Sequence, residues 1–268
     1  MIRTLVSVYP NLASVIAMNY ACQLSQVIDM EIQPIFVKEL EPGADAPGVG
    51  WVRRTWENSL LDTERDAVDR LIEAERSHCA NLARPLVFVG ERDNALLSNL
   101  MGGTYDLFVE GSLAGFEKSD FEQRVASELY RNLPCPVIIA RNLIQLHKVL
   151  VVFDDEVNIE KLLLGLSNLF DGARFHFDLL YCRVLGTGVS VDPIEEPENL
   201  FSQADEVLDR HGWAPENRLA LKGSPQGLIR RIEDYSLITT CLTQSIKADN
   251  GLIKLLGDTF SPVLLFRQ

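Results

Sequence analysis

The feature that most constrains the fold of this chain is a pattern of alternating strand-like and helix-like segments that runs through it twice. Each half begins with a short apolar strand, at Ile2–Val8 and at Val149–Phe153. An amphipathic helix follows each strand, at Leu12–Val27 and at Val157–Phe170. Strands that alternate with helices predict a parallel sheet covered on both faces. The repetition of the whole pattern predicts an internal duplication.

The other expected elements continue in the same order in both halves. The expected strands lie at Glu31–Val37, Leu86–Val89, Asp106–Val109 and Val137–Ala140, then at Phe175–Tyr181, Arg218–Leu221, Leu237–Thr240 and Val263–Phe266. The expected helices lie at Trp56–Leu82, Asp93–Leu100 and Phe121–Arg131, then at Leu200–His211, Gln226–Ile232 and Gly251–Leu256. Long loops are expected at Glu41–Gly50 and Gly186–Glu198, and Pro34 predicts an edge position or a local irregularity for its strand.

Three pairs of similar segments, in the same order and at similar spacing, support the duplication. The pairs are Met1–Tyr9 with Leu146–Asp154, Val87–Asp93 with Leu219–Pro225, and Pro134–Arg141 with Phe260–Arg267. The boundary between the halves is expected near Asn142–His147. We therefore expect two repeats, at residues 1–144 and 145–268.

The charge of the chain restricts its partners. It carries 25 Lys and Arg against 38 Asp and Glu, a net charge of -13 that both halves share. Such acidity works against nucleic acid or an anionic membrane surface as a general partner, because both are negatively charged. We expect neither as a partner.

The cysteines and the apolar segments indicate a compartment. The five cysteines form no C-x-x-C pair and are typical of reduced thiols in a cytosolic protein. No apolar run approaches the roughly 18 residues of a membrane span, and the first residues do not have the pattern of a signal peptide. We expect a soluble cytoplasmic protein.

Two segments in each half resemble the universal stress protein family. They are Tyr105–Ser112 and the helix leading to Pro134-Cys-Pro-Val137 in the first half, and Lys148–Asp155 and Ser261-Pro-Val263 in the second. The resemblance, to a tandem member of that family, covers nearly the whole chain. It implies an α/β protein made of two flavodoxin-like, or adenine nucleotide α-hydrolase-like, five-stranded parallel sheets. It also implies pseudo-two-fold symmetry, with the repeats packed as the family's homodimers pack, and a choice between members that bind ATP and members that do not.

The phosphate-binding stretch separates these two classes. In nucleotide-binding members it reads G-x-x-G, nine residues, then G-S or G-T. Glycines are needed there because backbone N–H groups must approach the phosphates closely. In the first repeat Gly111 and Ser112 match the opening, but Gly115 comes one residue late. The G-S pair would fall on Gln123–Arg124, which cannot form the same close cradle.

The second repeat keeps a different part of the family's site. No glycine follows Thr240, and the G-S pair would fall on Asp249–Asn250, where the aspartate would repel phosphate. The acidic residue that lies at the adenine end in ATP-binding members is kept as Asp154, with Asp155 beside it. In the first repeat Tyr9–Pro10 replaces it. The resemblance therefore leaves part of a site in each repeat and a complete motif in neither.

Each candidate residue also has a structural interpretation. Asp154 and Asp155 follow a strand and precede a helix, so we favour a helix-capping role over a ligand-binding one. Gly111 and Ser112 fit an anion site and a strand-to-helix turn equally well. No nucleophile elbow is present, and the four histidines are scattered without metal-ligand spacing. We expect no catalytic residue and no metal site.

These observations give a function hypothesis with an alternative. The favoured hypothesis is a non-enzymatic stress-response or regulatory protein with degenerate nucleotide motifs, acting through a protein partner or as a homodimer. The alternative is a protein that binds ATP or another adenine nucleotide, with Mg, in an altered site, and that hydrolyses ATP slowly. Asp154, Asp155, Gly111, Ser112 and Gly115 would form its site. A small-molecule enzyme on the same fold has no catalytic constellation to support it.

Overall fold

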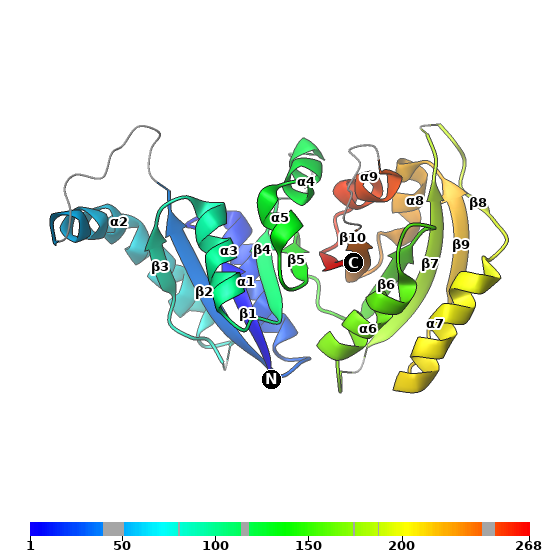
Figure 1. Ribbon diagram of the computed structural model, residues 1–268, viewed down its shortest axis with the longest axis horizontal. Coiled ribbons are helices and arrows are strands. Elements are labelled where there is room, and N and C mark those ends of the chain that lie inside the picture. The colour runs from blue at the N-terminus through cyan, green and yellow to red at the C-terminus, as the bar shows by residue number, and fades with distance from the viewer. Residues whose placement is uncertain (40–50, 80, 114–117, 174, 187, 243–249) are drawn as a thin grey trace.

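Two parallel sheets meet edge to edge and form one continuous sheet across the chain (Figure 1). The computed structural model describes residues 1–39, 51–79, 81–113, 118–173, 175–186, 188–242 and 250–268. The strands are β1 (Ile2–Ser7), β2 (Met30–Lys38), β3 (Leu86–Val89), β4 (Leu107–Gly111), β5 (Val137–Ala140), β6 (Lys148–Phe153), β7 (His176–Val184), β8 (Asp192–Pro193), β9 (Arg218–Gly223), β10 (Leu237–Leu242) and β11 (Val263–Arg267). Within these residues their order is β3-β2-β1-β4-β5-β11-β10-β6-β7-β9-β8.

The two repeats are related by a pseudo-two-fold axis at the joint between β5 and β11. All pairings inside β3-β2-β1-β4-β5 and inside β11-β10-β6-β7-β9 are parallel, whereas β5 pairs with β11 antiparallel. Ile138 faces Leu264 in that ladder. These two residues occupy the same place in the matched segments Pro134–Arg141 and Phe260–Arg267. The predicted pair of five-stranded parallel sheets with pseudo-two-fold symmetry is confirmed.

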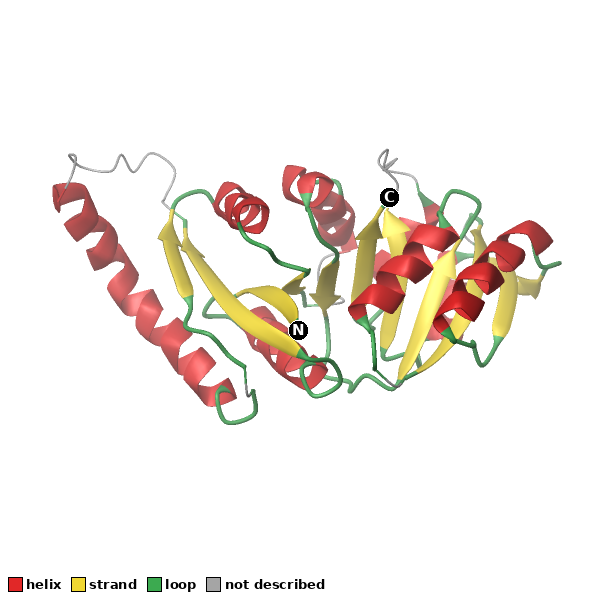
Figure 2. Cartoon of the chain, turned by 60° about the horizontal axis from the view of Figure 1, so that its bottom comes forward, coloured by secondary structure: helices red, strands yellow, loops and turns green. Residues whose placement is uncertain are grey.

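Helices cover both faces of the sheet, as the alternating pattern predicts (Figure 2). They are α1 (Leu12–Leu24), α2 (Trp51–Glu75), α3 (Arg92–Gly102), α4 (Lys118–Val125), α5 (Glu128–Asn132), α6 (Ile159–Leu169), α7 (Glu198–His211), α8 (Pro225–Ile232) and α9 (Gly251–Asp258). Asparagines begin several of them: Asn11 accepts from the N–H of Ser14, and Asn158 from that of Lys161. Such caps satisfy backbone N–H groups that have no partner inside the helix.

The core lies between the sheet and the helices of both faces. Every residue of β5 and β10 is buried, as expected for strands of a parallel sheet that is covered on both faces. Phe108 and Phe153 are fully buried, and each such side chain contributes about 1.5 to 3 kcal/mol to folding. No helix in the described part of the chain combines the length and the apolarity needed to cross a membrane.

Four local expectations need correction. The helix expected at Phe121–Arg131 is two helices, α4 and α5, because the Ser127 side chain accepts from the N–H of Tyr130 and begins a new helix. The loop expected at Gly186–Glu198 contains β8, which pairs antiparallel with β9. Helix α2 begins at Trp51 instead of residue 56 and ends at Glu75 instead of residue 82. The loop expected at Glu41–Gly50 lies outside the described residues.

The fourth correction concerns Pro34. Strand β2 is not an edge strand, because it lies between β1 and β3. The backbone of Ile32 bonds to residues 81 and 83, on the β3 side, while the C=O of Ile35 accepts from Val8 on the β1 side. Successive residues face opposite neighbours, so Pro34 faces the β3 side just before β3 begins at Leu86. No ladder hydrogen bond is lost there.

Candidate functional site

The candidate residues lie at the carboxyl ends of strands beside the points where the strand order reverses. In the first repeat this point separates β1 from β4, and in the second it separates β6 from β10. Open α/β sheets bind ligands at such points. Gly111 ends β4 and Ser112 follows it, and Asp154 and Asp155 follow β6. Gly115 lies outside the described residues. The two pairs of candidates therefore lie at two separate points of reversal, one in each repeat.

Gly111 is required by packing between α1 and β4. A Cβ added to Gly111 would lie 1.8 Å from the carbonyl oxygen of Ala13, in the first turn of α1. Its neighbour Ser112 donates its backbone N–H to the carbonyl oxygen of Ala140 at 2.8 Å, which extends the pairing of β4 with β5. The N–H that could have met a phosphate at Ser112 is therefore already bonded.

A buried charge network lies at the carboxyl end of β4 in the first repeat. The Glu110 carboxylate, in β4, is 2% exposed and accepts from Arg92 at 2.7 Å and from Arg124 at 3.3 Å. The hydroxyl of Tyr130 also donates to it. Burial alone would raise the pKa of Glu110, but Arg124 and Arg92 hold that pKa below its usual value.

Arg124 is the residue on which the motif's G-S pair would fall in the first repeat. Its guanidinium also donates to the carbonyl oxygen of Gly111 at 3.4 Å. Arg92 lies over the ring of Tyr9, 5.9 Å from its centroid. This network was missed by the sequence analysis, although a glutamate inside the apolar strand Leu107–Gly111 was a visible signal for a buried ionic partner.

In the second repeat Asp154 caps the turn that leads into α6. Its Oδ1 accepts from the backbone N–H groups of Glu156 at 2.9 Å and Val157 at 3.2 Å. The N-cap of α6 itself is Asn158. Burial, followed by the charges of Glu156 and Asp155, raises the pKa of Asp154.

The carboxylate of Asp155 interacts with a different set of partners. It accepts from the Tyr181 hydroxyl at 2.7 Å and lies 3.5 Å from Nη2 of Arg183. Arg183 in turn donates from Nε to the oxygen of Tyr181 at 2.8 Å. The side chains of Arg183 and Asp155 are 58% and 62% exposed, so this ion pair contributes little to stability.

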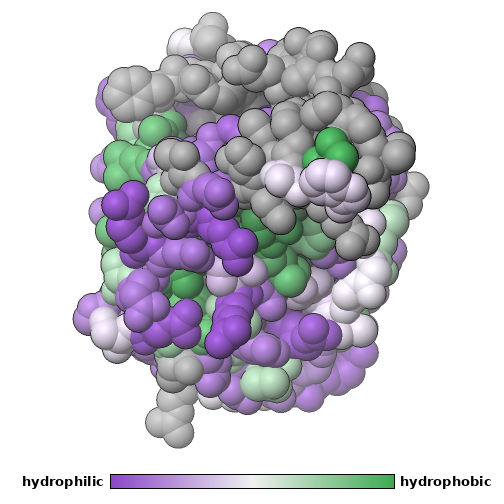
Figure 3. Space-filling view, turned by 90° about the vertical axis from the view of Figure 1, so that its left-hand side faces the viewer, coloured by the Kyte–Doolittle hydropathy of each residue, from purple (hydrophilic) through white to green (hydrophobic). Residues whose placement is uncertain are grey.

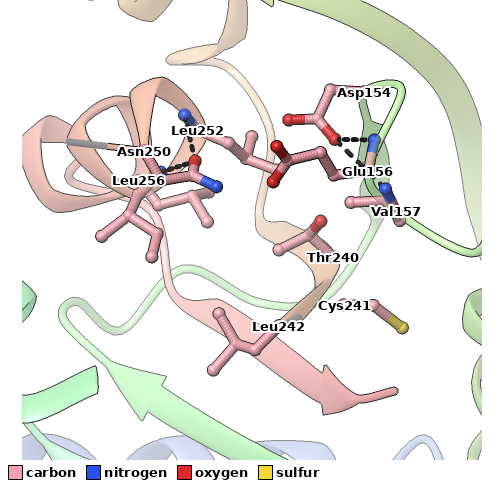
Figure 4. A pocket seen from close by; sticks show the side chains of 10 residues that line it. Asp154, Glu156, Val157, Thr240, Cys241, Leu242, Asn250, Leu252 and Leu256 are labelled. Atoms are coloured by element: carbon pink, nitrogen blue, oxygen red, sulfur yellow. Dashed lines mark hydrogen bonds between the residues drawn. The ribbon is translucent and has the colours of Figure 1, made fainter. Parts of the chain in front are cut away.

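A cleft of about 540 Å³ opens beside these residues. It is lined by Asp154, Asp155, Glu156, Cys182, Arg183, Val184, Leu185, Asn250, Gly251 and Leu252. At its α9 side, Asn250 accepts from the N–H groups of Leu252 at 2.8 Å and Ile253 at 3.2 Å (Figure 4). A Cβ on Gly251 would lie 2.7 Å from Cβ of Val184, so this glycine also serves close packing. The backbone donors that an anion would use at this helix end are taken by Asn250.

The described residues contain no group of three or more His, Cys, Asp or Glu side chains that could hold a metal ion. The five cysteines are buried free thiols. Burial raises the pKa of the Cys135 and Cys241 thiols to about 12, which keeps both protonated at neutral pH.

Comparison with known proteins shows the fold. No protein-family model and no curated protein matches the chain. A universal stress protein from Archaeoglobus fulgidus is 13% identical, with 99% of this chain and 98% of that chain covered and a TM-score of 0.68. A functionally unknown protein from Pseudomonas aeruginosa is 15% identical, with 99% and 92% covered and a TM-score of 0.61. A universal stress protein family protein from Arabidopsis thaliana, solved with AMP bound, is 14% identical, with 53% and 92% covered and a TM-score of 0.35.

The two full-length likenesses cover both repeats at once. This chain therefore has the tandem fold of the Archaeoglobus universal stress protein, as the resemblance in its sequence implied. Fold does not by itself determine function.

Proposed function

We propose that the chain is a tandem universal stress protein that acts as a non-enzymatic regulatory protein through protein partners, and that it has no phosphate site of the family's motif. The full-length likeness to a universal stress protein supports the family. One observation carries the rest: at described residues near the expected phosphate positions, backbone N–H groups already bond to protein groups. These are the N–H of Ser112 in the first repeat and those of Leu252 and Ile253 in the second.

In the first repeat a phosphate would have to break the network of Glu110 with Arg92 and Arg124. Arg92 also pairs with Asp93 at 2.8 Å, so the carboxylates of Glu110 and Asp93 balance the two guanidinium groups. The network therefore offers little net attraction to an anion. Gly111 lies in close contact with the backbone of Ala13, so there is no room for a phosphate between α1 and the end of β4.

In the second repeat a phosphate at α9 would have to displace the side chain of Asn250. It would also meet the carboxylates of Asp154, Asp155 and Glu156, which line the same cleft. Like charges within a few ångströms repel, so this arrangement opposes a nucleotide triphosphate.

A protein partner is supported by an exposed apolar groove between α1 and α2. The groove has a volume of about 520 Å³ and is lined by Pro10, Asn11, Leu12, Val15, Ala67, Arg70, Leu71, Ala74 and Glu75. Leu12 is 61% exposed. Figure 3 shows the end of the molecule that carries α2, where apolar patches lie between hydrophilic side chains. Exposed apolar surface of this kind is typical of interaction sites. The net charge of -13 works against nucleic acid or an anionic membrane as that partner.

The alternative, an adenine-nucleotide-binding protein with slow ATP hydrolysis, has one observation in its favour. The cleft of about 540 Å³ beside Asp154 lies at the usual ligand position of the fold and is large enough for a small molecule.

Thermal unfolding with and without millimolar ATP, at the same free Mg²⁺ concentration in both samples, separates the two hypotheses. A ligand at 100 times its dissociation constant stabilises a protein by about 2.7 kcal/mol. We expect no change in unfolding temperature. A rise that disappears in the Asp154→Ala variant would establish the alternative, with the nucleotide in the second repeat.

A further inference from the structure

A narrow crevice opens at the inner end of the second-repeat cleft and has room for about one water-sized particle. Its volume is about 10 Å³. Its oxygen-bearing side chains are Asp154 and Glu156 after β6, Thr240 in β10, and Asn250 at the start of α9 (Figure 4). The other lining residues are Val157, Cys241, Leu242, Leu252, Ile253 and Leu256.

Thr240 places an unpartnered hydroxyl in this crevice. The residue is fully buried, and its Oγ1 has no hydrogen-bond partner among the described residues. In Figure 4 the hydroxyl oxygen points toward the side chains of Glu156 and Asp154. A buried polar atom without a partner in a folded protein calls for an explanation such as a bound water or ion.

The carboxylates of Asp154 and Glu156 also have oxygen atoms available to bind a cation. Both backbone donors that reach Asp154 bond to Oδ1, so Oδ2 has no partner among the described residues. The Glu156 carboxylate forms no ion pair within that same part of the chain, and the nearby guanidinium of Arg183 is bonded to Asp155 and Tyr181. The crevice therefore brings together oxygen ligands and two carboxylates that form no ion pair with another described residue.

Comparison of the two repeats shows which charges are missing here. In the ladder of β4 with β5, Glu110 pairs with Ile139. In the equivalent ladder of β10 with β11, Thr240 pairs with Leu265, the residue that matches Ile139. Thr240 therefore occupies the position of Glu110. By the same registers and the matched segments, Asp154 takes the place of Tyr9.

The two arginines that neutralise Glu110 have no basic counterpart in the second repeat. Counting back from the closing strands places Asn250 where the first repeat has Arg124. The strand registers place Pro225 where it has Arg92, and each of these residues is the first of its helix. The second repeat has thus lost two built-in cations and gained an acid at the equivalent place.

We propose that this crevice binds one divalent cation of the Mg²⁺ type, held by the carboxylates of Asp154 and Glu156 and by the hydroxyl of Thr240. Mg²⁺ prefers hard oxygen ligands and commonly keeps several waters while bound by one or two carboxylates. The adjoining cleft of about 540 Å³ has room for those waters. This inference is independent of whether a nucleotide binds, since it uses no phosphate.

The test is thermal unfolding of the full chain in chelator-treated buffer, titrated with MgCl₂ at constant ionic strength set with KCl. We expect a saturable rise in unfolding temperature without any nucleotide. Asp154→Asn and Thr240→Val are each expected to weaken the apparent affinity at least ten-fold. Thr240→Val is also expected to raise the unfolding temperature of the metal-free protein, because it removes a buried hydroxyl without a partner.

Asp155→Asn is the matched control. It makes the same charge change one residue away, at a side chain that lines the outer cleft but not the crevice. We expect it to keep the affinity within about three-fold, since neither Asp155 nor its partner Arg183 lines the crevice and exposed charges are screened by salt. A stabilisation that does not saturate, or that survives in both Asp154→Asn and Thr240→Val, would overturn the proposal, because it would report general ionic screening.

A second measurement needs no variant. The wild-type chain is titrated with Mn²⁺ while the electron paramagnetic resonance signal of free Mn²⁺ is monitored. We expect one bound Mn²⁺ per chain, displaced by Mg²⁺. No binding, or binding that Mg²⁺ cannot displace, would overturn the proposal.

Discussion

Arg141, at the end of the first repeat, donates from Nη1 to the carbonyl oxygen of Leu256 in α9 of the second repeat, at 2.6 Å. The same nitrogen donates to the carbonyl oxygen of Thr259 at 2.6 Å, and the guanidinium lies over the ring of Phe121. Carbonyl groups at the end of a helix attract cations. The repeats are therefore joined by a buried side-chain contact as well as by the ladder between β5 and β11.

Replacing Arg141 with methionine should destabilise the protein by about 2 kcal/mol, because the buried carbonyls of Leu256 and Thr259 lose a charged donor. Burial lowers the pKa of Arg141 to about 10, so the side chain is charged at neutral pH. Urea unfolding would measure the loss. The exposed Arg131→Met is the control and should change stability by no more than about 0.5 kcal/mol. An equal effect of both variants would argue against the inter-repeat contact.

Replacing Glu110 with glutamine should cost about 2 to 3 kcal/mol at neutral pH, because Arg92 and Arg124 lose their buried counter-charge. The pKa of Glu110 is lowered in the folded state, so its stabilisation is complete above the usual glutamate pKa of about 4.3 and disappears as the pH falls through the lowered value. Denaturant unfolding of both proteins from pH 7 downward should show the two curves converging in acid. The exposed Glu206→Gln should show no such convergence.

Replacing Gly111 with alanine should destabilise the protein by about 3 kcal/mol, because the added methyl group would overlap the backbone of Ala13. Gly102→Ala is the matched control. Its added Cβ would have no atom within 4 Å, so the change should be neutral or slightly stabilising. Calorimetry of the two variants decides between packing and ligand binding as the reason for Gly111. A Gly111→Ala protein as stable as the wild type would contradict the packing explanation.

Replacing Asp154 with asparagine should raise the unfolding temperature in magnesium-free buffer at neutral pH, by roughly 1 to 2 °C. Asparagine keeps an Oδ1 acceptor for Glu156 and Val157 but removes a charge that burial and neighbouring acids disfavour. The pKa of Asp154 is raised in the folded state, so the wild type regains stability as the pH falls through that value, and the difference should shrink in acid. A variant less stable than wild type throughout would show that the charge itself supports the turn.

Local pattern predicted the elements well where the chain is buried and periodic. The ranges Leu86–Val89 and Val137–Ala140 agree with β3 and β5 at both ends, because short apolar runs between polar turns have no other stable placement in an α/β chain. The break at Ser127 and the short β8 were not predicted, since each depends on one hydrogen bond or one neighbouring strand.

The sequence by itself determined the duplication, the parallel sheets and the loss of the glycine motif, because these follow from the order of residues along the chain. Tertiary structure alone decided what replaces that motif. Glu110 meets Arg92 and Arg124, and Asp154 meets Thr240 across one crevice, through pairs that lie between 14 and 86 residues apart. Such neighbours are set by strand order and register, and a one-residue change of register would send every side chain of a strand to the opposite face.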